Sequence, residues 1–342
     1  MTSAREEGTD GRAAGRDGGA QTFTLIIPTH RRPGFVVQAV DSALRQERAF
    51  DRIIVIPDGL DDPAPDALAG LPVDVHPVAH GGVSAARNAG LALADTDWVC
   101  FLDDDDLLHP AYLADLEAAV GAHPETSAFN APYWSFAAVA GPHEEFSATS
   151  LDECLSASGS AVPRNDMSYL EITGRSYDAL LEKLAGSMST AAVRTAVLRE
   201  AGGFPVDLIA AEDWTMYVNV ARLTEWRVLD ERRAFFRAHG DNAMSGRSRG
   251  KMLAPLRAIR SFWRSGQPSP PHASLEAYRR AYRNEVMTAL AGCRRNGDAE
   301  GREEALRIAA EILPRRWDRI FIRMPRPVRS VMWRLERGSR AS

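Results

Sequence analysis

The sequence predicts an α/β fold in which a mostly parallel sheet is flanked by helices and followed by a helical C-terminal extension. Two observations carry this prediction. Between residues 23 and 102, short apolar runs of strand length alternate with segments of helical periodicity, which is the pattern of right-handed βαβ units on a parallel sheet. After Gly250 the apolar residues recur at helical spacing instead.

The individual strands and helices are predicted from the spacing of apolar residues. The run 23–28 is apolar, rich in β-branched residues and closed by Pro28, which fits a strand buried on both faces. Pro33 stands where a helix can begin, and apolar residues recur at helical spacing behind it. The predicted strands are 23–28, 53–56, 73–78 and 98–102, and the predicted helices are 33–46, 84–94, 212–223, 251–265, 274–294 and 299–313.

The composition describes a globular protein and argues against several classes. The chain has 342 residues, of which 45% are hydrophobic and 25% are charged, enough for one large domain and an appendage. The formal net charge of −5 gives no support to nucleic-acid binding. The chain has three cysteines, an odd number that cannot pair completely, and their spacing is not that of metal ligands; they are Cys100, Cys154 and Cys293. Neither a membrane-spanning run nor a signal peptide is visible, so we expect a cytoplasmic protein with reduced thiols.

Four consecutive carboxylates, residues 103–106, follow the predicted strand 98–102. Because like charges repel, a fold retains such a run where a divalent cation or several hydrogen-bond donors offset the repulsion. Thr29 and Asp58 also stand just beyond predicted strands. Ligands of parallel sheets bind beyond the carboxyl ends of the strands, so we expect these side chains to meet in one crevice. A solvated acidic turn is the alternative for the run.

Several motifs, taken in order, resemble the family 2 glycosyltransferases with the Rossmann-like GT-A fold. Pro57 departs from the pattern, because the family often has an Asp there, and His30-Arg31 stands where Tyr-Asn or His-Asn is usual. The similarity extends roughly from residue 23 to residue 246. The motifs are IIPTHRRP at 26–33, DG at 58–59, GVSAARNAG at 82–90, FLDDDD at 101–106, AGGF at 201–204 and EDW at 212–214.

The resemblance implies a metal-dependent inverting glycosyltransferase that moves a sugar from a nucleoside-diphosphate sugar to an acceptor hydroxyl or amine. Mn²⁺ or Mg²⁺ would offset the charge on the leaving diphosphate, and a UDP-sugar is the expected donor. The donor-binding residues implied are Thr29 and Asp58 near the base, Asp103 near the ribose, Arg87 near the diphosphate, and Asp104; the implied metal-binding residues are Asp105, Asp106 and His239.

For three of these residues the sequence allows another role or orientation. Arg87, in the first turns of a helix behind a glycine pair, could reach the diphosphate or form a surface salt bridge. Asp104 faces away from Asp103 and Asp105 if the backbone there is extended. His239 could ligate the metal as neutral imidazole, hold the diphosphate as a cation, or be a loop histidine without either role.

Glu212 and Asp213 stand at the start of a predicted helix, where acids often serve only as capping and dipole partners. The resemblance implies that Asp213 is the general base that takes the acceptor's proton and that Glu212 supports it. A base facing the sugar opposite the diphosphate implies a single displacement with inversion at the anomeric carbon.

Two other classes of protein fit the sequence less well. A sugar-1-phosphate nucleotidyltransferase would need a glycine-rich phosphate loop directly after the first strand, and residues 28–32 supply none. A catalytically silent nucleotide-sugar binder or scaffold would not need both Asp105 and Asp213. The motif and membrane helices of processive polysaccharide synthases are absent, so we expect one transfer per acceptor.

The predicted domain organisation has three parts. Residues 1–21 lack apolar periodicity and are expected to be a disordered tail. The GT-A domain is expected at 22–247, with a nucleotide-sugar-binding half at 22–125 and an acceptor-binding half at 126–247, and the helical extension with its basic tail at 248–342.

The acceptor and other partners are predicted only by class. The acceptor is a glycan, a peptide or a small natural product, and the aperiodic insert 137–184 is assigned to its recognition. The segment 315–337 interleaves arginines with aromatics, so it fits an anionic membrane surface at the inner face, an acidic partner, or packing back on the GT-A domain. No nucleic-acid partner is expected, and a homodimer is left open.

Overall fold

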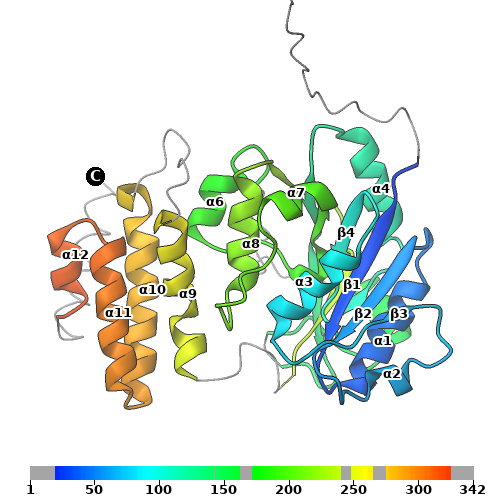
Figure 1. Ribbon diagram of the computed structural model, residues 1–342, viewed down its shortest axis with the longest axis horizontal. Helices are drawn as coiled ribbons and strands as arrows, with labels where there is room; N and C mark the ends of the chain where they lie inside the picture. The colour runs from blue at the N-terminus through cyan, green and yellow to red at the C-terminus, as the bar shows by residue number, and fades with distance from the viewer. Residues whose placement is uncertain (1–19, 142, 162–171, 240–247, 265–274, 325–342) are drawn as a thin grey trace, which may run out of the picture.

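The computed structural model describes residues 20–141, 143–161, 172–239, 248–264 and 275–324. Most of the predicted tail (residues 1–19) and the distal part of the basic segment (325–337) lie outside the described residues. Within them, a mixed α/β domain occupies one end of the molecule and a group of helices the other (Figure 1).

The main sheet has the strand order β10-β6-β9-β4-β1-β2-β3. Its pairs are parallel except for those of β9, which runs antiparallel to both β4 and β6. The predicted mostly parallel sheet is therefore confirmed. The strands are β1 (Phe23–Thr29), β2 (Arg52–Pro57), β3 (Asp74–Val75), β4 (Trp98–Phe101), β6 (Ala128–Asn130), β9 (Ala192–Arg194) and β10 (Trp226–Val228).

Helices cover both faces of this sheet, which explains why the interior strand β1 is buried along its whole length. Every residue of β1 is buried, and alternate residues face opposite sides. Leu25 and Ile27 pack in one core with α1 (Pro33–Leu44) and α4 (Tyr112–Ala122). Ile26 packs in the other core with α3 (Val83–Leu93), α7 (Thr195–Glu200) and α8 (Glu212–Ala221).

The third strand is shorter than the predicted 73–78. Pro77 has no N–H to donate, so the regular ladder of β3 ends early. The pairing nevertheless continues on either side of the proline: His76 donates to the carbonyl of Val55, and Val78 donates to that of Pro57. The short helix α2 (Ala64–Ala67), between β2 and β3, was not predicted.

Gly90 lets α3 approach β1 closely. A Cβ added at Gly90 would lie 2.5 Å from Cγ2 of Ile26. We expect Gly90→Ala to destabilise the fold by about 1–3 kcal/mol, the usual cost of overpacking a core, measured as a lower midpoint of urea unfolding. Gly121→Ala in α4 is the matched control, since nothing lies within 4 Å of its added Cβ. Equal midpoints for the two variants would contradict the close approach.

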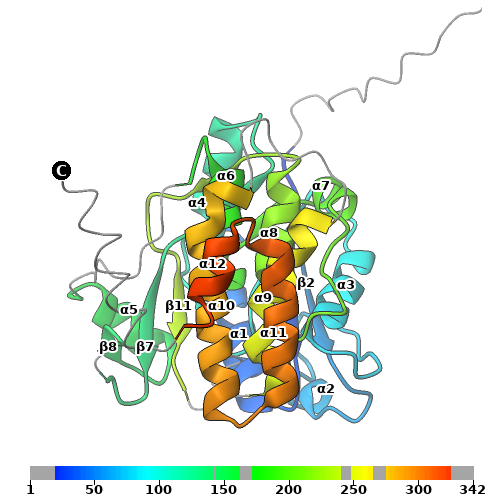
Figure 2. The same cartoon turned by 90° about the vertical axis from the view of Figure 1, so that its left-hand side faces the viewer.

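A second, four-stranded sheet has the order β5-β11-β7-β8. It comprises β5 (Leu107–Leu108), β11 (Ala234–Arg237), β7 (Tyr133–Ala137) and β8 (Phe146–Ser147), and α5 (Leu151–Ser158) packs on it. Figure 2 shows β7, β8, α5 and β11 as a group at one side of the molecule. Because β5 directly follows the acidic run and pairs with β11, this sheet brings the chain around His239 to that run.

The insert 137–184 is only partly a surface feature. Its described end includes α6 (Ser176–Glu182), whose Leu180 is buried in the core shared with α8. The indole nitrogen of Trp214 donates to the carbonyl of Leu180 at 2.6 Å. Residues 172–182 therefore support the helix that carries Asp213, and the assignment to acceptor recognition stays a prediction for the rest of the insert, of which 162–171 lie outside the described residues.

Three helices of the extension were predicted with nearly the observed boundaries, and a fourth, α12 (Arg316–Phe321), was not. The described residues of the extension form α9 (Arg249–Arg264), α10 (Leu275–Arg295), α11 (Ala299–Ile312) and α12, with α9 next to α8 (Figure 1). The described part of the basic segment packs on α10: Arg283 donates to the buried Asp318 at 2.9 Å and lies over the ring of Phe321. It thus packs on the extension rather than on the GT-A domain. No described helix is both long and apolar enough to cross a membrane.

Candidate active site

The acidic run forms a turn, which decides where its four carboxylates point. The backbone N–H of Asp106 donates to the carbonyl of Asp103 at 3.1 Å, so the run is not extended and its side chains do not alternate between two sides. The premise on which Asp104 was expected to face away is therefore wrong.

Asp104 joins the acidic run to the first motif. Its Oδ2 accepts from the hydroxyl of Thr29 at 2.7 Å, and its Oδ1 accepts from Nη1 of Arg32 at 3.1 Å. Burial, together with the charge of Asp105, raises the pKa of Asp104 to about 6 against the opposing effect of the Thr29 hydrogen bond. Thr29 and Asp104 thus meet as the convergence of strand ends predicts, and they bind each other.

Asp105 and His239 also lie together. A single oxygen of Asp105, Oδ2, contacts Nε2 of His239 at 2.9 Å and Nη1 of Arg32 at 2.8 Å. Three residues from distant parts of the chain therefore meet at one carboxylate oxygen. Arg32 was missed as a site residue, although it stands inside the first motif.

Asp106 does not join this group. Its Oδ2 accepts from the hydroxyl of Ser189 at 2.5 Å and its Oδ1 accepts from the backbone N–H of Arg237 at 2.9 Å. Burial and the charges of Asp105 and Asp103 raise its pKa well above the usual range. Its oxygens are held by the second sheet and by the 3₁₀ helix η1 (Met188–Thr190), so both already bind groups of the protein.

Arg87 connects the acidic run to α8. Its guanidinium donates to Oδ1 of Asp103 at 2.6 Å and to Oε1 of Glu212 at 2.9 Å. The Arg87 side chain is only 4% exposed, which rules out the surface salt bridge. Since Glu212 is already bound by Arg87 and no side-chain cap is present at Ala211, Glu212 serves as a partner of Arg87 rather than as a helix cap.

Asp213, the predicted general base, lies in the first turn of α8. It is half-buried, and its Oδ1 accepts from the backbone N–H of Trp214 at 2.6 Å. Burial and the neighbouring charge of Glu212 raise the pKa of Asp213 to about 7. The residue before the helix, Ala211, has a left-handed φ of 59°, a conformation that costs an L-residue energy and that recurs at functional sites.

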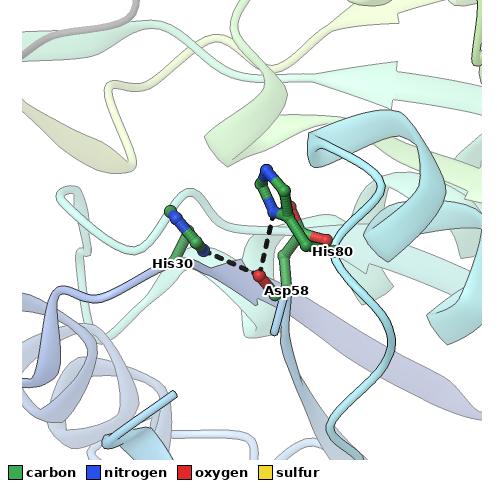
Figure 3. A group of neighbouring side chains, drawn as sticks. All are labelled: His30, Asp58 and His80. Carbon is green, nitrogen blue, oxygen red and sulfur yellow. Dashed lines mark hydrogen bonds and ion pairs between the residues drawn. The ribbon is translucent and has the colours of Figure 1, made fainter. Parts of the chain in front are cut away.

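Asp58 lies at the end of β2 with two histidines over it (Figure 3). Its carboxylate accepts from the backbone N–H groups of Gly81 and Gly82 at 2.7 and 2.9 Å, so it fixes the loop that leads into α3. Nδ1 of His80 lies 2.9 Å from the same carboxylate, and Nδ1 of His30 lies 2.7 Å from the Asp58 carbonyl oxygen. Neither histidine was predicted as a site residue.

Residues 24–143 match the family model described as glycosyl transferase family 2. This part of the chain is similar to the glycosyltransferases of family 2. The matched segment contains the acidic run, Thr29, Asp58 and Arg87, whereas Asp213 and His239 lie beyond it. The succinoglycan biosynthesis protein ExoW of Rhizobium meliloti is 34% identical over 123 residues, which are 33% of this chain and 37% of that protein. The chain thus matches little more than a third of this curated relative's length.

The likeness to solved structures covers more of the chain. S. aureus TarS 1–349, solved with UDP-GlcNAc, has 18% identity and a TM-score of 0.52, covering 85% of this chain and 71% of that one. The mannosyltransferase PcManGT of Pyrobaculum calidifontis, solved with GDP-Man and Mn²⁺, has 17% identity and a TM-score of 0.52, covering 86% and 76%. At these identities the likeness shows the fold, which is the predicted GT-A fold.

Proposed function

We propose that the protein is a metal-dependent, inverting glycosyltransferase that uses a nucleoside-diphosphate sugar. The observation that carries this proposal is the continuous connection from Asp103 through Arg87 to Glu212, because it places the start of α8, with Asp213, beside the acidic run. One site then holds donor-binding carboxylates and a carboxyl group whose pKa of about 7 suits a general base.

The residues around Asp105 fit a divalent cation. A carboxylate oxygen and an imidazole nitrogen lie 2.9 Å apart there, and carboxylate oxygen and imidazole are ligands that Mn²⁺ accepts. Magnesium-type sites commonly use one or two protein carboxylates and complete the shell with substrate phosphates and water, so Asp105 and His239 suffice as protein ligands. A bound Mn²⁺ or Mg²⁺ would neutralise charge on the leaving diphosphate.

The chain's own residues perform the proton transfer in this proposal. Asp213 accepts the proton of the acceptor hydroxyl or amine as the new bond to the anomeric carbon forms, and the bond from that carbon to the diphosphate breaks on the opposite side. The proton remains on the Asp213 carboxyl. Arg87 holds Glu212 in place, and the charge of Glu212 beside Asp213 helps to raise the pKa of Asp213.

The donor and acceptor are proposed by class. A UDP-sugar is favoured, since the TarS structure holds UDP-GlcNAc, while PcManGT with GDP-Man keeps the guanine nucleotide as the second candidate. The acceptor is a glycan, a peptide or a small natural product. A cytoplasmic location, with peripheral contact at the inner membrane face through the basic segment, is part of the same proposal.

A thermal-shift screen of UDP, dTDP and GDP with Mn²⁺ tests the donor class. The matching nucleotide at 100 times its Kd should add about 2.7 kcal/mol to the free energy of unfolding, seen as a raised melting temperature. The shift should disappear in excess chelator. If none of the three nucleotides shifts the melting temperature with or without Mn²⁺, the proposal fails.

Arg32 is expected to compete with the cation for Asp105. A carboxylate oxygen has two lone pairs, and both partners of Asp105 Oδ2 are already in place. We expect Arg32→Gln to bind Mn²⁺ about tenfold more tightly without nucleotide, because even in water a unit charge at 4 Å is worth about 1 kcal/mol. Free Mn²⁺ is measured by electron paramagnetic resonance.

Arg31→Gln is the matched control for Arg32→Gln. Arg31 is exposed and pairs with Asp61 instead of the acidic run, so its loss should leave Mn²⁺ affinity nearly unchanged. Weaker rather than tighter binding by Arg32→Gln would mean that Arg32 holds Asp105 in its metal-binding position.

A further inference from the structure

We propose that His30, Asp58 and His80 form a second cation site, suited to Zn²⁺ or another late first-row transition metal. In the part of the chain that the structure describes, these three residues are the group whose possible ligand atoms converge, all lying within 4.8 Å of one another. The site is separate from Asp105 and His239 and uses none of their atoms.

The two imidazoles converge on one point. Nδ1 of His30 and Nδ1 of His80 lie 2.7 and 3.2 Å from the same carbonyl oxygen, that of Asp58. The rings are stacked with centroids 4.7 Å apart, and Figure 3 shows both turned toward Asp58. Both histidines are exposed, so small ring rotations can bring their nitrogens to a common cation without moving the core.

The carboxylate of Asp58 is fixed in advance, which is what a metal site requires of its ligands. It is only 6% exposed, and the N–H groups of Gly81 and Gly82 hold it. Each oxygen keeps lone-pair capacity beyond these bonds. One rigid carboxylate and two adjustable imidazoles therefore face the same small volume.

The ligand set selects the kind of cation. Two neutral imidazoles and one carboxylate are the ligands of open zinc sites, in which water or another molecule takes the fourth position. Imidazole suits Zn²⁺, Cu²⁺ and Ni²⁺, whereas all-oxygen sites suit Mg²⁺ and Ca²⁺. We therefore expect the site to prefer Zn²⁺ to Mg²⁺.

A cation at this site would interfere with nucleotide binding, and this consequence rests on the proposed function. Asp58 is the group proposed to accept an N–H of the nucleobase. A cation that takes its free lone pair removes that acceptor, so Zn²⁺ and the nucleoside diphosphate should exclude each other. The structure thus assigns to this triad a means by which zinc inhibits donor binding.

Calorimetric titration of the full chain with Zn²⁺ alone tests the site without any donor. The double variant His30→Ala/His80→Ala should bind Zn²⁺ at least about tenfold more weakly, since loss even of groups that only orient ligands costs 10- to 100-fold. His123→Ala is the matched control, because it removes a histidine elsewhere, beside Glu125. Far-ultraviolet circular dichroism checks that the variants fold.

The Asp105→Asn variant separates the two cation sites. It should lose Mn²⁺ binding and keep the affinity for Zn²⁺. Unchanged Zn²⁺ affinity in the double histidine variant would overturn the proposal, as would loss of Zn²⁺ binding in Asp105→Asn with retention in the double variant.

Nucleotide titration with and without saturating Zn²⁺ tests the consequence. Weaker binding of UDP in Zn²⁺, with no such effect in the double histidine variant, is expected. If UDP binds equally with Zn²⁺ present, the cation site stands and the mutual exclusion is wrong. If UDP binds under neither condition while Zn²⁺ still depends on the histidines, the proposed donor is wrong and the site remains.

Discussion

Replacing Asp213 by asparagine should lower transfer by about 10²–10⁴-fold, the usual contribution of a general base. Asparagine keeps nearly the same volume and can still accept from the backbone N–H of Trp214, as Asp213 does at 2.6 Å, so the fold should be retained. Donor affinity should barely change, because the donor-side groups lie on β1, β2, α3 and the acidic run. Single-turnover transfer, or donor hydrolysis without an acceptor, measures the rate, and calorimetry measures the donor Kd.

The pH dependence gives a second readout of the same base. Since burial and Glu212 raise the pKa of Asp213 to about 7, the carboxyl is protonated and inactive below that pH and is a base above it. The kcat/KM of the wild type should therefore rise with pH and level off above about 7, because kcat/KM reports groups of the free enzyme. The low-pH limb should vanish in Asp213→Asn.

Glu212→Gln is the variant that distinguishes the two neighbouring acids. It keeps the side chain's length but weakens the bond with Arg87, now 2.9 Å, and removes a charge that raises the pKa of Asp213. We expect a smaller loss of rate and a low-pH limb shifted to lower pH. Near-normal transfer by Asp213→Asn together with loss in Glu212→Gln would assign the base to Glu212.

The parallel core could be predicted because its strands must be apolar on both faces. The seven residues of β1 are all buried, and the apolar and β-branched residues among them are visible in the sequence as a strand. The antiparallel strand β9 could not be predicted, since its three residues carry no pattern that specifies pairing with β4 and β6. The second sheet was not predicted as a sheet, because two of its strands, β5 and β8, have only two residues each and carry no pattern that specifies their pairing.

In the candidate site, too, contacts that follow from the predicted sheet could be predicted, whereas contacts between residues far apart in the sequence could not. The convergence of Thr29 with the acidic run follows from the carboxyl ends of parallel strands. The bond between Arg87 and Glu212 spans 125 positions, and no local pattern encodes it. The resemblance implied a metal-binding role for Asp106, whereas its oxygens contact the hydroxyl of Ser189 and the backbone N–H of Arg237, distant residues that no local pattern indicates.

Replacing Asp105 by asparagine should abolish metal-supported binding of the nucleoside diphosphate and, with it, transfer. The substitution keeps the size of the side chain but removes the negative charge on which a divalent cation depends, so Mn²⁺ affinity should fall by at least about 100-fold, the upper end of the loss caused by groups that only support ligands. Asp61→Asn is the matched control, since Asp61 is 75% exposed and forms an ion pair with Arg31, away from the acidic run.

The two aspartate variants should fail in opposite ways, which makes their comparison decisive for the mechanism. Asp105→Asn should lose both Mn²⁺ binding and donor binding, whereas Asp213→Asn should lose turnover alone. This difference follows from the structure: Asp105 shares its Oδ2 with Arg32 and His239, while Asp213 stands at the start of α8, linked to the run through Glu212 and Arg87. Undiminished transfer by the wild type in excess chelator would show that the carboxylates serve the donor without a metal.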